Sequence, residues 1–390
     1  MKTSKWLRGL ARLAVALALT VGAAVALLQI PAVEDEFRCF VTETFYPPYA
    51  PSAAPDDLVV VSALAETEPV ANKCDAADDP AIWINREEPT KSLVLGTNKR
   101  QAINVYNLDG ELLSQRKLGA PNNVDIREID INGETTVVVG TSDKDPGELA
   151  LFALDPLSAT LVDILETPIK ARTEVETYGF CFYKSPLTNH LYAIATDKSG
   201  QIEQWLIEPT ESGGLQAELS RVLRVPSQAE GCVADDTNAR LFVGEEDVGI
   251  WSFGAEPDVA SQGQLIAGAA DSIATGVHLA ADVEGLAVYA EPGSDSAGYL
   301  VVSSQGNDTY VLFDRIAPHA YRGTFQVEID GVKTGDTDGL DVTSLPAGPD
   351  YAEGLVVVQD GARAWLGQGN QNFKLVPWHS VAQALELDNR

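Results

Sequence analysis

A short motif recurs six times along the 390 residues of this chain, and no other feature of the sequence limits the fold as strongly. Most copies place a polar or aromatic side chain before small and β-branched residues, which are typical of a strand. The copies begin near residues 79, 123, 178, 230, 283 and 337, so the spacing is about fifty residues. Internal repeats of this length indicate units that stack around a common core.

Two further apolar runs with strand composition follow each motif, and polar turns separate them. The first set spans residues 92–96, 135–140, 191–196, 240–244, 299–303 and 354–358. The second set spans residues 103–108, 149–154, 202–207, 249–253, 310–313 and 373–376. Fourth strands are less regular, and the clearest of them are residues 111–118 and 217–225. Because such units recur six times without long amphipathic helices, we predict an all-β fold, a six-bladed β-propeller of four-stranded antiparallel blades.

The last repeat ends near Trp378 without an obvious fourth strand, while an apolar run at residues 58–61 precedes the first motif. A blade that lacked its outer strand would expose a sheet edge, which proteins usually cover. We therefore predict that residues near 57–65 supply this strand, so that an N-terminal strand closes the ring.

The N-terminus has the order of charge and hydrophobicity of an export signal, with four basic residues within the first twelve positions. The apolar run at 13–30 is long for a cleaved signal peptide and nearly long enough to span a bilayer, so a cleaved leader and a membrane tether both stay open. We expect residues 1–33 to be a signal peptide or anchor, 34–56 a linker and 57–390 the propeller. The expected location is extracytoplasmic, whether secreted, periplasmic or membrane-anchored.

Acidic residues outnumber basic residues 57 to 27. Nucleic acid and anionic membranes are therefore poor partners, because both need a basic footprint. The acidic excess is explained equally by solubility and by cation binding, since clustered carboxylates attract a hard cation such as Ca²⁺. Composition leaves both explanations open, and the positions of the carboxylates have to decide.

Export permits disulfides, and the chain has four cysteines, Cys39, Cys74, Cys181 and Cys232. Cys181 and Cys232 occupy equivalent places in two consecutive repeats, so we expect the pairs Cys181–Cys232 and Cys39–Cys74. Four cysteines allow three pairings, and buried free thiols are the alternative. The sequence has no CxxC motif, so it gives no support for a zinc or redox motif.

Acidic side chains stand at the starts of the repeated motifs. In a propeller the first strand of each blade lines the channel, so these starts meet at one face. The motif starts contribute Asp78, Asp79, Asp125, Tyr178, Glu230, Asp282, Glu284 and Asp338. The ends of the second runs add Glu245, Glu246, Asp247, Gln305, Asn307, Gln359 and Asp360. A single carboxylate in such a loop is usually explained by turn formation. Because these recur at one position in six repeats, and because Ca²⁺ takes roughly six to eight oxygen ligands, calcium binding is the better explanation.

A few basic residues occupy equivalent positions among these acidic residues. Lys99, Lys144 and Lys198 follow the ends of second runs, and Arg127 ends the second motif. Ion pairing with nearby carboxylates is the plain explanation, and such pairs are weak at a surface. Phosphate recognition is the sharper explanation, because Arg and Lys bind phosphate oxygens that metal ions also bridge. Acidic and basic groups around one channel therefore indicate a polyanionic, metal-chelating substrate.

Short segments in every blade resemble the β-propeller phytases. They include DDPAIW at 78–83, TNK at 97–99, NNVDIR at 122–127, YGF at 178–180, DVEGL at 282–286, SSQGN at 303–307, DTDGLDV at 336–342 and NQNFKLVPW at 370–378. The similarity runs from about residue 60 to 385. It implies a calcium-dependent phosphoric monoester hydrolase of the 3-phytase type, which acts on myo-inositol hexakisphosphate and its calcium complex.

The resemblance also assigns roles to individual positions. Lys99, Arg127 and Lys198 would bind substrate phosphates, Tyr178 would contact the phosphate at the cleavage site, and Glu230 would also be catalytic. Several calcium ions would be held by Asp78, Asp79, Glu230, Glu246, Asp282, Glu284, Gln305, Asp330, Asp338 and Asp360. The implied reaction is in-line attack by a water that calcium activates, which releases inorganic phosphate and lower inositol phosphates.

Other functions compete with this one. The sequence lacks RHGxRxP and has no histidine at a motif start, which argues against an acid histidine phosphatase. A calcium-dependent lactonase or esterase propeller needs an apolar acyl pocket but no group of cations. A non-catalytic exported propeller would lose the acidic rim, and a protein that binds phosphate for uptake would show no turnover. We expect a monomer whose partner is the small-molecule substrate phytate.

Overall fold

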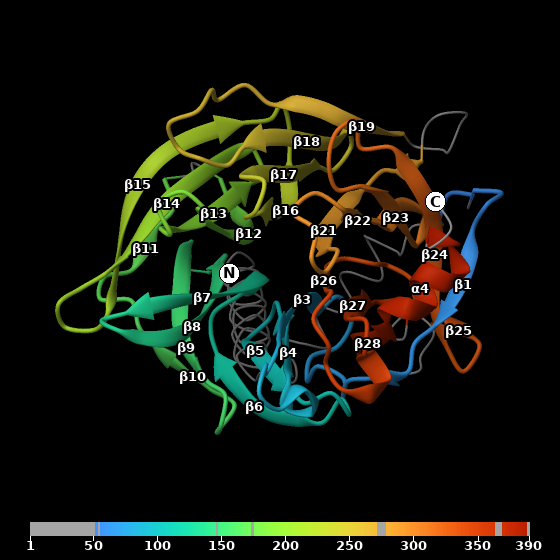
Figure 1. Ribbon diagram of the computed structural model, residues 1–390, viewed down its shortest axis with the longest axis horizontal. Helices are drawn as coiled ribbons and strands as arrows, with labels where there is room; N and C mark the ends of the chain where they lie inside the picture. The colour runs from blue at the N-terminus through green and yellow to red at the C-terminus, as the bar shows by residue number, and fades with distance from the viewer. Residues whose placement is uncertain are drawn as a thin grey trace, which may run out of the picture.

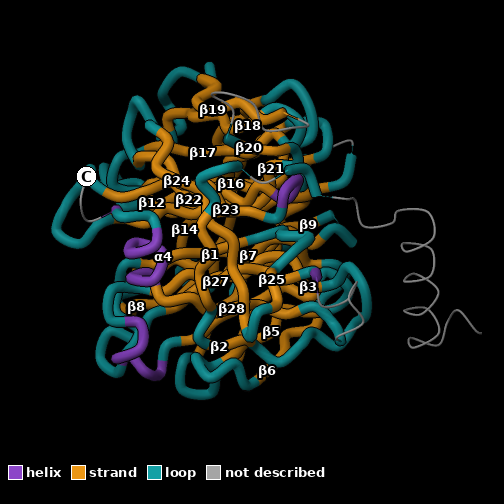
Figure 2. The backbone as a smooth tube through the Cα atoms, turned by 90° about the vertical axis from the view of Figure 1, so that its right-hand side faces the viewer, coloured by secondary structure: helices purple, strands orange, loops and turns teal. Residues whose placement is uncertain are grey.

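The computed structural model describes residues 51–53, 55–145, 147–172, 175–270, 278–362 and 369–387. These residues form six sheets arranged as a ring, and the first strand of each sheet lies nearest the central channel (Figure 1). Figure 2, a view from the side, shows the connecting loops at the two faces of the ring. The predicted six-bladed β-propeller is therefore confirmed. The expected leader at 1–33 lies outside the described residues, as does most of the expected linker.

Each blade has four principal strands, and within a blade they pair in chain order except at the closure of the ring. The first blade contains β3 Ala77–Trp83, β4 Leu93–Asn98, β5 Ala102–Tyr106 and β6 Leu112–Lys117. The second contains β7 Pro121–Ile131, β8 Glu134–Asp143, β9 Glu148–Asp155 and β10 Thr160–Asp163. The third contains β12 Thr177–Lys184, β13 Leu191–Asp197, β14 Gln201–Pro209 and β15 Leu215–Arg224. The fourth blade contains β16 Ala229–Asp235, β17 Arg240–Glu245, β18 Gly249–Gly254 and β19 Gln264–Ala270. The fifth contains β21 Val283–Ala290, β22 Gly298–Ser304, β23 Thr309–Asp314 and β24 Tyr321–Ile329. The sixth contains β26 Leu340–Thr343, β27 Leu355–Asp360, β28 Asn372–Pro377 and β2 Ala65–Glu66. Short elements at the edges and loops are β1 Val59–Ser62, β11 Ile169–Lys170, β20 Leu279–Ala280, β25 Val332–Lys333, η1 Pro89–Lys91, η2 Gln305–Asn307, η3 Pro349–Tyr351 and α4 Trp378–Ala384.

The outer strands explain why the fourth run of each repeat was hard to find in the sequence. The inner strand pair β4 and β5 is buried along its whole length, so its residues are almost continuously apolar or small. The outer strand β6 alternates between half-buried and exposed residues, because one side of it faces solvent. Polar residues therefore interrupt its hydrophobic pattern, and the same holds for β15.

The N-terminal segment closes the ring through residues at the very end of the predicted stretch, 57–65. β2 pairs antiparallel with β28 and completes the sixth blade, with Ala65 opposite Leu375. β1 instead pairs parallel with β24 and adds a fifth strand to the fifth blade. The stretch predicted as one closing strand is thus divided between two blades, because each of them presents an edge that needs a partner. Figure 1 shows β1 running beside β24, next to α4.

The hydrophobic core lies between neighbouring blades. Six clusters of buried apolar side chains each join strands from two adjacent blades. Leu95 and Val105 of the first blade, for example, pack with Val139 and Phe152 of the second. The inner strands enclose a channel cavity of about 220 Å³. Since the blades bury their apolar surface against one another, the channel itself is free to carry polar side chains.

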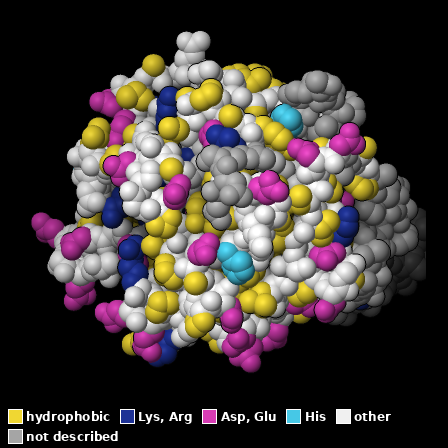
Figure 3. Space-filling model, turned by 45° about the vertical axis from the view of Figure 1, so that its right-hand side comes forward, with side chains coloured by type: hydrophobic (Ala, Val, Ile, Leu, Met, Phe, Trp, Pro, Cys, Tyr) yellow, Lys and Arg dark blue, Asp and Glu magenta, His cyan; other side chains and the backbone are white. Residues whose placement is uncertain are grey.

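One disulfide joins the inner strands of the third and fourth blades, Cys181 on β12 to Cys232 on β16. Cys74 is also disulfide-bonded, and Cys39, its expected partner, lies outside the described residues. Over the part of the chain that the structure describes, no helix is both long and apolar enough to cross a membrane. The expected tether at 13–30 falls outside that part. Asp and Glu side chains are spread over the surface seen in Figure 3, where they are more frequent than Lys and Arg.

Candidate functional site

One side chain per blade lies near the start of the first strand, and in five of the six blades a β-bulge places it there. In five blades the pairing of the first two strands shifts register just inside the strand start, and in the sixth blade the same position precedes β26. A bulge turns side chains out of the regular alternation and often lies beside a site. The first bulged residues of five blades are Asp78, Asn122, Tyr178, Glu230 and Glu284, and Asp338 holds the equivalent position before β26 in the sixth. We call this ring of six side chains the channel mouth.

In the third, fourth and fifth blades, glycine at the second bulged position lets neighbouring blades approach closely. A Cβ on Gly179 would collide with the carbonyl oxygen of Glu230, and one on Gly231 would collide with that of Glu284. Thr196 Oγ1 accepts a hydrogen bond from the Gly179 N–H (2.9 Å) and donates one to the Glu230 carbonyl oxygen (3.0 Å). Backbone contacts between blades therefore set the spacing of the side chains in the channel mouth.

Three glutamates form the densest acidic group at the channel mouth. Carboxylate oxygens of Glu230, Glu246 and Glu284 all lie within 4.8 Å of one another. Burial and the charges of neighbouring carboxylates raise the pKa of each, and that of Glu246 reaches about 8. Glu230 and Glu284 also share a hydrogen bond between their carboxyl groups. At neutral pH the group is stable only with protons or a cation among its oxygens.

Amide and acidic neighbours extend this group. Asn122 Nδ2 donates to Glu230 Oε1 at 2.6 Å, and Gln228 Nε2 donates to Glu246 Oε1 at 2.5 Å. Asp282 lies beside Asp247, and burial together with that charge raises its pKa. The oxygen atoms thus come from the second, fourth and fifth blades.

Lys99 is the cation that faces the other half of the channel mouth. Its Nζ lies 2.6 Å from Asp75 Oδ1, 2.9 Å from Asp78 Oδ1 and 3.3 Å from Asp338 Oδ2. Burial lowers the pKa of Lys99, but the charges of Asp338, Asp75 and Asp78 outweigh burial and raise it well above its ordinary value. Gln305 Nε2 donates to the other oxygen of Asp338. Lys99 therefore stays charged among carboxylates.

Two buried oxygens at the channel mouth lack any hydrogen-bond partner in the described structure. They are Asp78 Oδ2 and Asn122 Oδ1, and both residues are almost fully buried. A buried acceptor without a partner is costly, so such atoms call for a ligand. Because all the atoms of this group that could bind a metal ion are oxygens, the group fits a hard cation such as Ca²⁺.

Two lysines other than Lys99, namely Lys144 and Lys198, lie over the ring of Tyr178. Lys198 Nζ is 4.5 Å from the centre of the Tyr178 ring, and Lys144 Nζ is 5.1 Å from it. Glu176 Oε1 lies 3.1 Å from Lys198 Nζ and 3.8 Å from Lys144 Nζ. The charge of Glu230, together with burial, raises the pKa of the Tyr178 hydroxyl far above its ordinary value, so this group remains a neutral donor.

Arg127 lies deeper in the channel than the three lysines. It stands five positions after Asn122 along β7, which is about 16 Å of extended strand. Its guanidinium donates to Asp125 Oδ1 at 2.8 Å and to Asp236 Oδ2 at 2.9 Å. Neither Arg127 nor Asp125 is therefore brought to the channel mouth, where the sequence had placed both. Lys144, which the sequence showed in an equivalent loop but which received no role, lies there instead.

Two expected calcium ligands, Asp79 and Asp360, have partners elsewhere, and a third, Asp330, is exposed in a turn. Asp79 Oδ2 accepts the backbone N–H of Val124 in the next blade at 2.9 Å. Asp360 Oδ2 lies 2.9 Å from the buried Lys374 Nζ, so a lysine already balances its charge. Asp330 is exposed in the turn between β24 and β25, where its φ of 52° marks it as a turn residue. These positions stand apart from the dense acidic group.

Sequence reasoning missed three residues of this site, namely Asn122, Glu176 and Gln228, and it named Lys144 only among the candidate phosphate-binding cations, without a role of its own. Lys144 had the clearest signal, because it follows the end of β8 as Lys99 follows β4 and Lys198 follows β13. Asn122 stands at the start of the second motif and was overlooked in favour of the charged Asp125. Glu176 and Gln228 lie in the loops just before β12 and β16, where their own sequence gave no signal.

Comparison with known proteins gives one family. A family model described as Phytase matches residues 40–390. The 3-phytase of Bacillus subtilis (strain 168) is 41% identical over 334 residues, which cover 83% of this chain and 85% of that protein. Two crystal structures of BBS1N in complex with ARL6DN, soaked with mercury and with lead, match with TM-scores of 0.42 and 11% identity. Those matches cover 73% and 76% of this chain and 75% and 78% of the solved chains, and their similarity is too low to bear on function.

Proposed function

The chain belongs to the phytase family, and from this premise we propose that it is a calcium-dependent phytase that acts on calcium phytate. As a phosphoric monoester hydrolase of the 3-phytase class, it hydrolyses phosphomonoesters of myo-inositol hexakisphosphate. The products are inorganic phosphate and lower inositol phosphates. The observation that carries the proposal is the meeting of three lysines with buried, mutually repelling carboxylates around one channel mouth.

Calcium fits the acidic half of the channel mouth. The residues that would hold it are Glu230, Glu246 and Glu284, with the unpaired oxygens of Asp78 and Asn122 beside them. This donor set offers only oxygen, and its raised carboxyl pKa values indicate charge that a cation would balance. When bound, calcium would supply Lewis-acid polarisation of the phosphate and a water of lowered pKa.

The basic half would bind the phosphate oxygens of the substrate. Lys99, Lys144 and Lys198 are point charges on three neighbouring blades, and they offset the charge that phosphoryl transfer spreads over the equatorial oxygens. Tyr178 stays protonated and would donate a hydrogen bond to one of these oxygens. Burial raises the pKa of Glu230, so its carboxylate is a stronger base than that of a free glutamate and would accept a proton from the attacking water.

Arg127 has a structural role in this proposal. Its charge is already balanced by Asp125 and Asp236 within the channel wall. The cavity around it is lined with charged as well as apolar side chains, including Asp79 and Asp341, and so offers a poor acyl pocket for a lactonase or esterase. Substrate phosphates would be held at the channel mouth above this layer.

We also propose that the chain works outside the cytoplasm as a monomer. The support for this location is the export-like order of charge and hydrophobicity at its N-terminus.

The test of the proposed function is phosphate release from calcium phytate by the purified chain, with p-nitrophenyl butyrate as a parallel ester substrate. We expect inorganic phosphate from phytate and no hydrolysis of the butyrate ester. Hydrolysis of the ester without phosphate release would favour the esterase alternative. Tight binding of phytate without release of phosphate would favour a binding protein, and either result would overturn the proposal.

A further inference from the structure

We propose that Glu176 is an internal anion that occupies a phosphate position between Lys144 and Lys198 and thereby weakens substrate binding. The proposal rests on the function proposed above, because it assigns a competitor to the same phosphate-binding lysines. It concerns one carboxylate outside the dense acidic group, which neither the repeat pattern nor the bulges of the first strands bring into the site.

A single oxygen of Glu176 meets both ammonium groups. Glu176 Oε1 lies 3.1 Å from Lys198 Nζ and 3.8 Å from Lys144 Nζ. Both lysines also lie over the ring of Tyr178. A phosphate oxygen bound by two lysines takes the same kind of position as this carboxylate oxygen, since both are anionic acceptors of charge-assisted hydrogen bonds. The Glu176 carboxylate therefore stands where an anionic ligand of the two lysines would bind.

The backbones of the two lysines are held independently of the Glu176 side chain. The Lys144 N–H donates to the Ala120 carbonyl oxygen at 3.0 Å, and the Lys198 N–H lies 3.4 Å from the backbone carbonyl oxygen of Glu176. Both positions follow the ends of long inner strands, β8 and β13. Loss of the carboxylate would thus leave the two ammonium groups at the same place but without their internal partner.

The ion pairs of Glu176 are easy to displace. The side chain of Glu176 is 43% exposed, that of Lys198 is 37% exposed and that of Lys144 is 18% exposed. The shorter pair, Glu176–Lys198, is thus open to solvent, and such ion pairs are weak. A substrate phosphate carries more charge than one carboxylate and can replace it. Until it does so, the carboxylate repels the phosphate and occupies the shared position, so each binding event includes its displacement.

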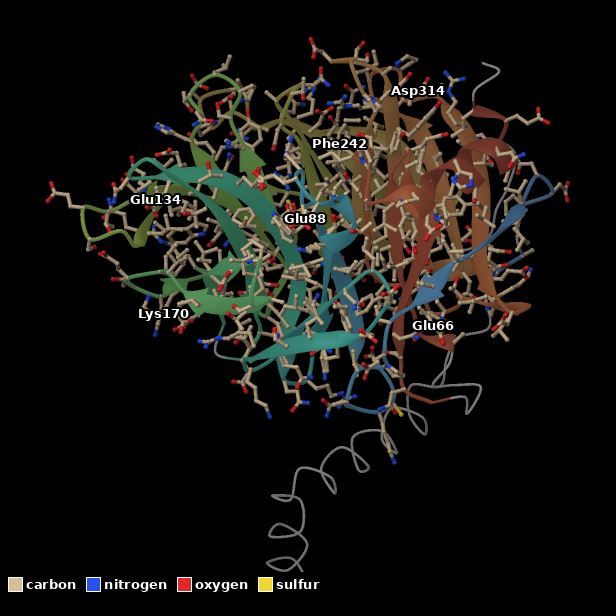
Figure 4. All side chains as sticks on the ribbon, turned by 60° about the horizontal axis from the view of Figure 1, so that its bottom comes forward. Glu66, Glu88, Glu134, Lys170, Phe242 and Asp314 are labelled. Carbon is tan, nitrogen blue, oxygen red and sulfur yellow. A yellow bond between two sulfur atoms is a disulfide. The ribbon has the colours of Figure 1, made fainter. Side chains whose placement is uncertain are left out.

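The experiment compares Glu176→Gln with Glu88→Gln as a matched control. Glu88, labelled in Figure 4, also forms an exposed ion pair with a lysine, 2.8 Å to Lys91, in the loop between β3 and β4 at the end of the blade away from the channel mouth. Both variants lose one negative charge; Glu176→Gln removes it from beside two lysines, and Glu88→Gln from beside one. Two quantities are measured for the full chain: steady-state kcat and KM with calcium phytate, and the affinity for myo-inositol hexasulfate by calorimetry.

Glu176→Gln should bind the hexasulfate about three- to tenfold more tightly and lower KM by a similar factor, with kcat within about twofold of wild type. Glu88→Gln should change neither quantity. Unchanged or weaker binding by Glu176→Gln would overturn the proposal, because it would mean that the carboxylate supports the lysines. If the hexasulfate binds more tightly but the wild-type chain releases no phosphate from phytate, the internal anion stands and the proposed phytase function falls.

Discussion

Removal of divalent cations should make the stability of the protein fall as pH rises from about 5 to 8. Burial and the neighbouring Glu230 raise the pKa of Glu246 from 4.5 to about 8 in the folded protein. Between these values the folded chain binds a proton that the unfolded chain has lost. Stability is therefore complete below the unfolded pKa and is lost as pH rises through the folded pKa.

The size of this effect follows from the same pair of pKa values. A rise from 4.5 to about 8 corresponds to about 5 kcal/mol at full strength. Glu246 is only partly buried, so solvent screening reduces the expected change to about 2 kcal/mol. For a domain of this length each kcal/mol corresponds to roughly 1.5 °C, which predicts a fall in Tm of about 3 °C. Calcium at a hundred times its Kd would instead add about 2.7 kcal/mol and should abolish the fall.

Differential scanning calorimetry in a metal chelator, at pH 5, 6, 7 and 8, measures this dependence. Glu246→Gln is the internal control, because it removes one of the titrating groups and should make the fall in Tm with pH less steep. A Tm in chelator that is constant or rises over this range would refute the reasoning. So would a profile that calcium leaves unchanged at pH 8.

Three further substitutions test separate parts of the site. Lys198→Ala should raise KM for phytate about three- to tenfold by removing a partly exposed phosphate contact, and an unchanged KM in steady-state assays would contradict its role. Arg127→Met leaves Asp125 and Asp236 unpaired, so it should lower the free energy of unfolding by about 3 kcal/mol in denaturant titrations without changing KM. A raised KM with normal stability would instead indicate that Arg127 binds a substrate phosphate. Replacing Cys181 and Cys232 together by serine should cost about 2–4 kcal/mol, seen as a lower Tm, because the disulfide closes a loop across 51 positions; an unchanged Tm would show that the pair adds no stability.

The ring of blades was predictable because its inner strands are buried on both faces. Continuous apolar runs such as β4 and β5 mark them in the sequence. The closing strand was harder to predict, since one short segment serves two sheet edges. Only the three-dimensional pairing shows that Val61 belongs to the fifth blade and Ala65 to the sixth.

The acidic half of the site was also largely predictable, because Glu230 and Glu284 start motifs that recur at one position. Asn122 was missed because a bulge adds a residue to one strand without a change in composition, so the charged Asp125 drew attention three positions later. The depth of Arg127 along β7 could not be read from its motif. The ion pair between Asp360 and Lys374 could not be predicted from the sequence either, because Lys374 comes close to Asp360 only when β28 pairs with β27.

The central claim is that calcium held among these carboxylates enables the lysine-bound phosphate to be hydrolysed. Its most direct test is the rate of inorganic phosphate release from phytate by the metal-free chain, before and after calcium is restored. We predict that release stops in chelator and returns when calcium is supplied in excess. Release that continues unchanged in chelator, or that does not return with calcium, would contradict the claim.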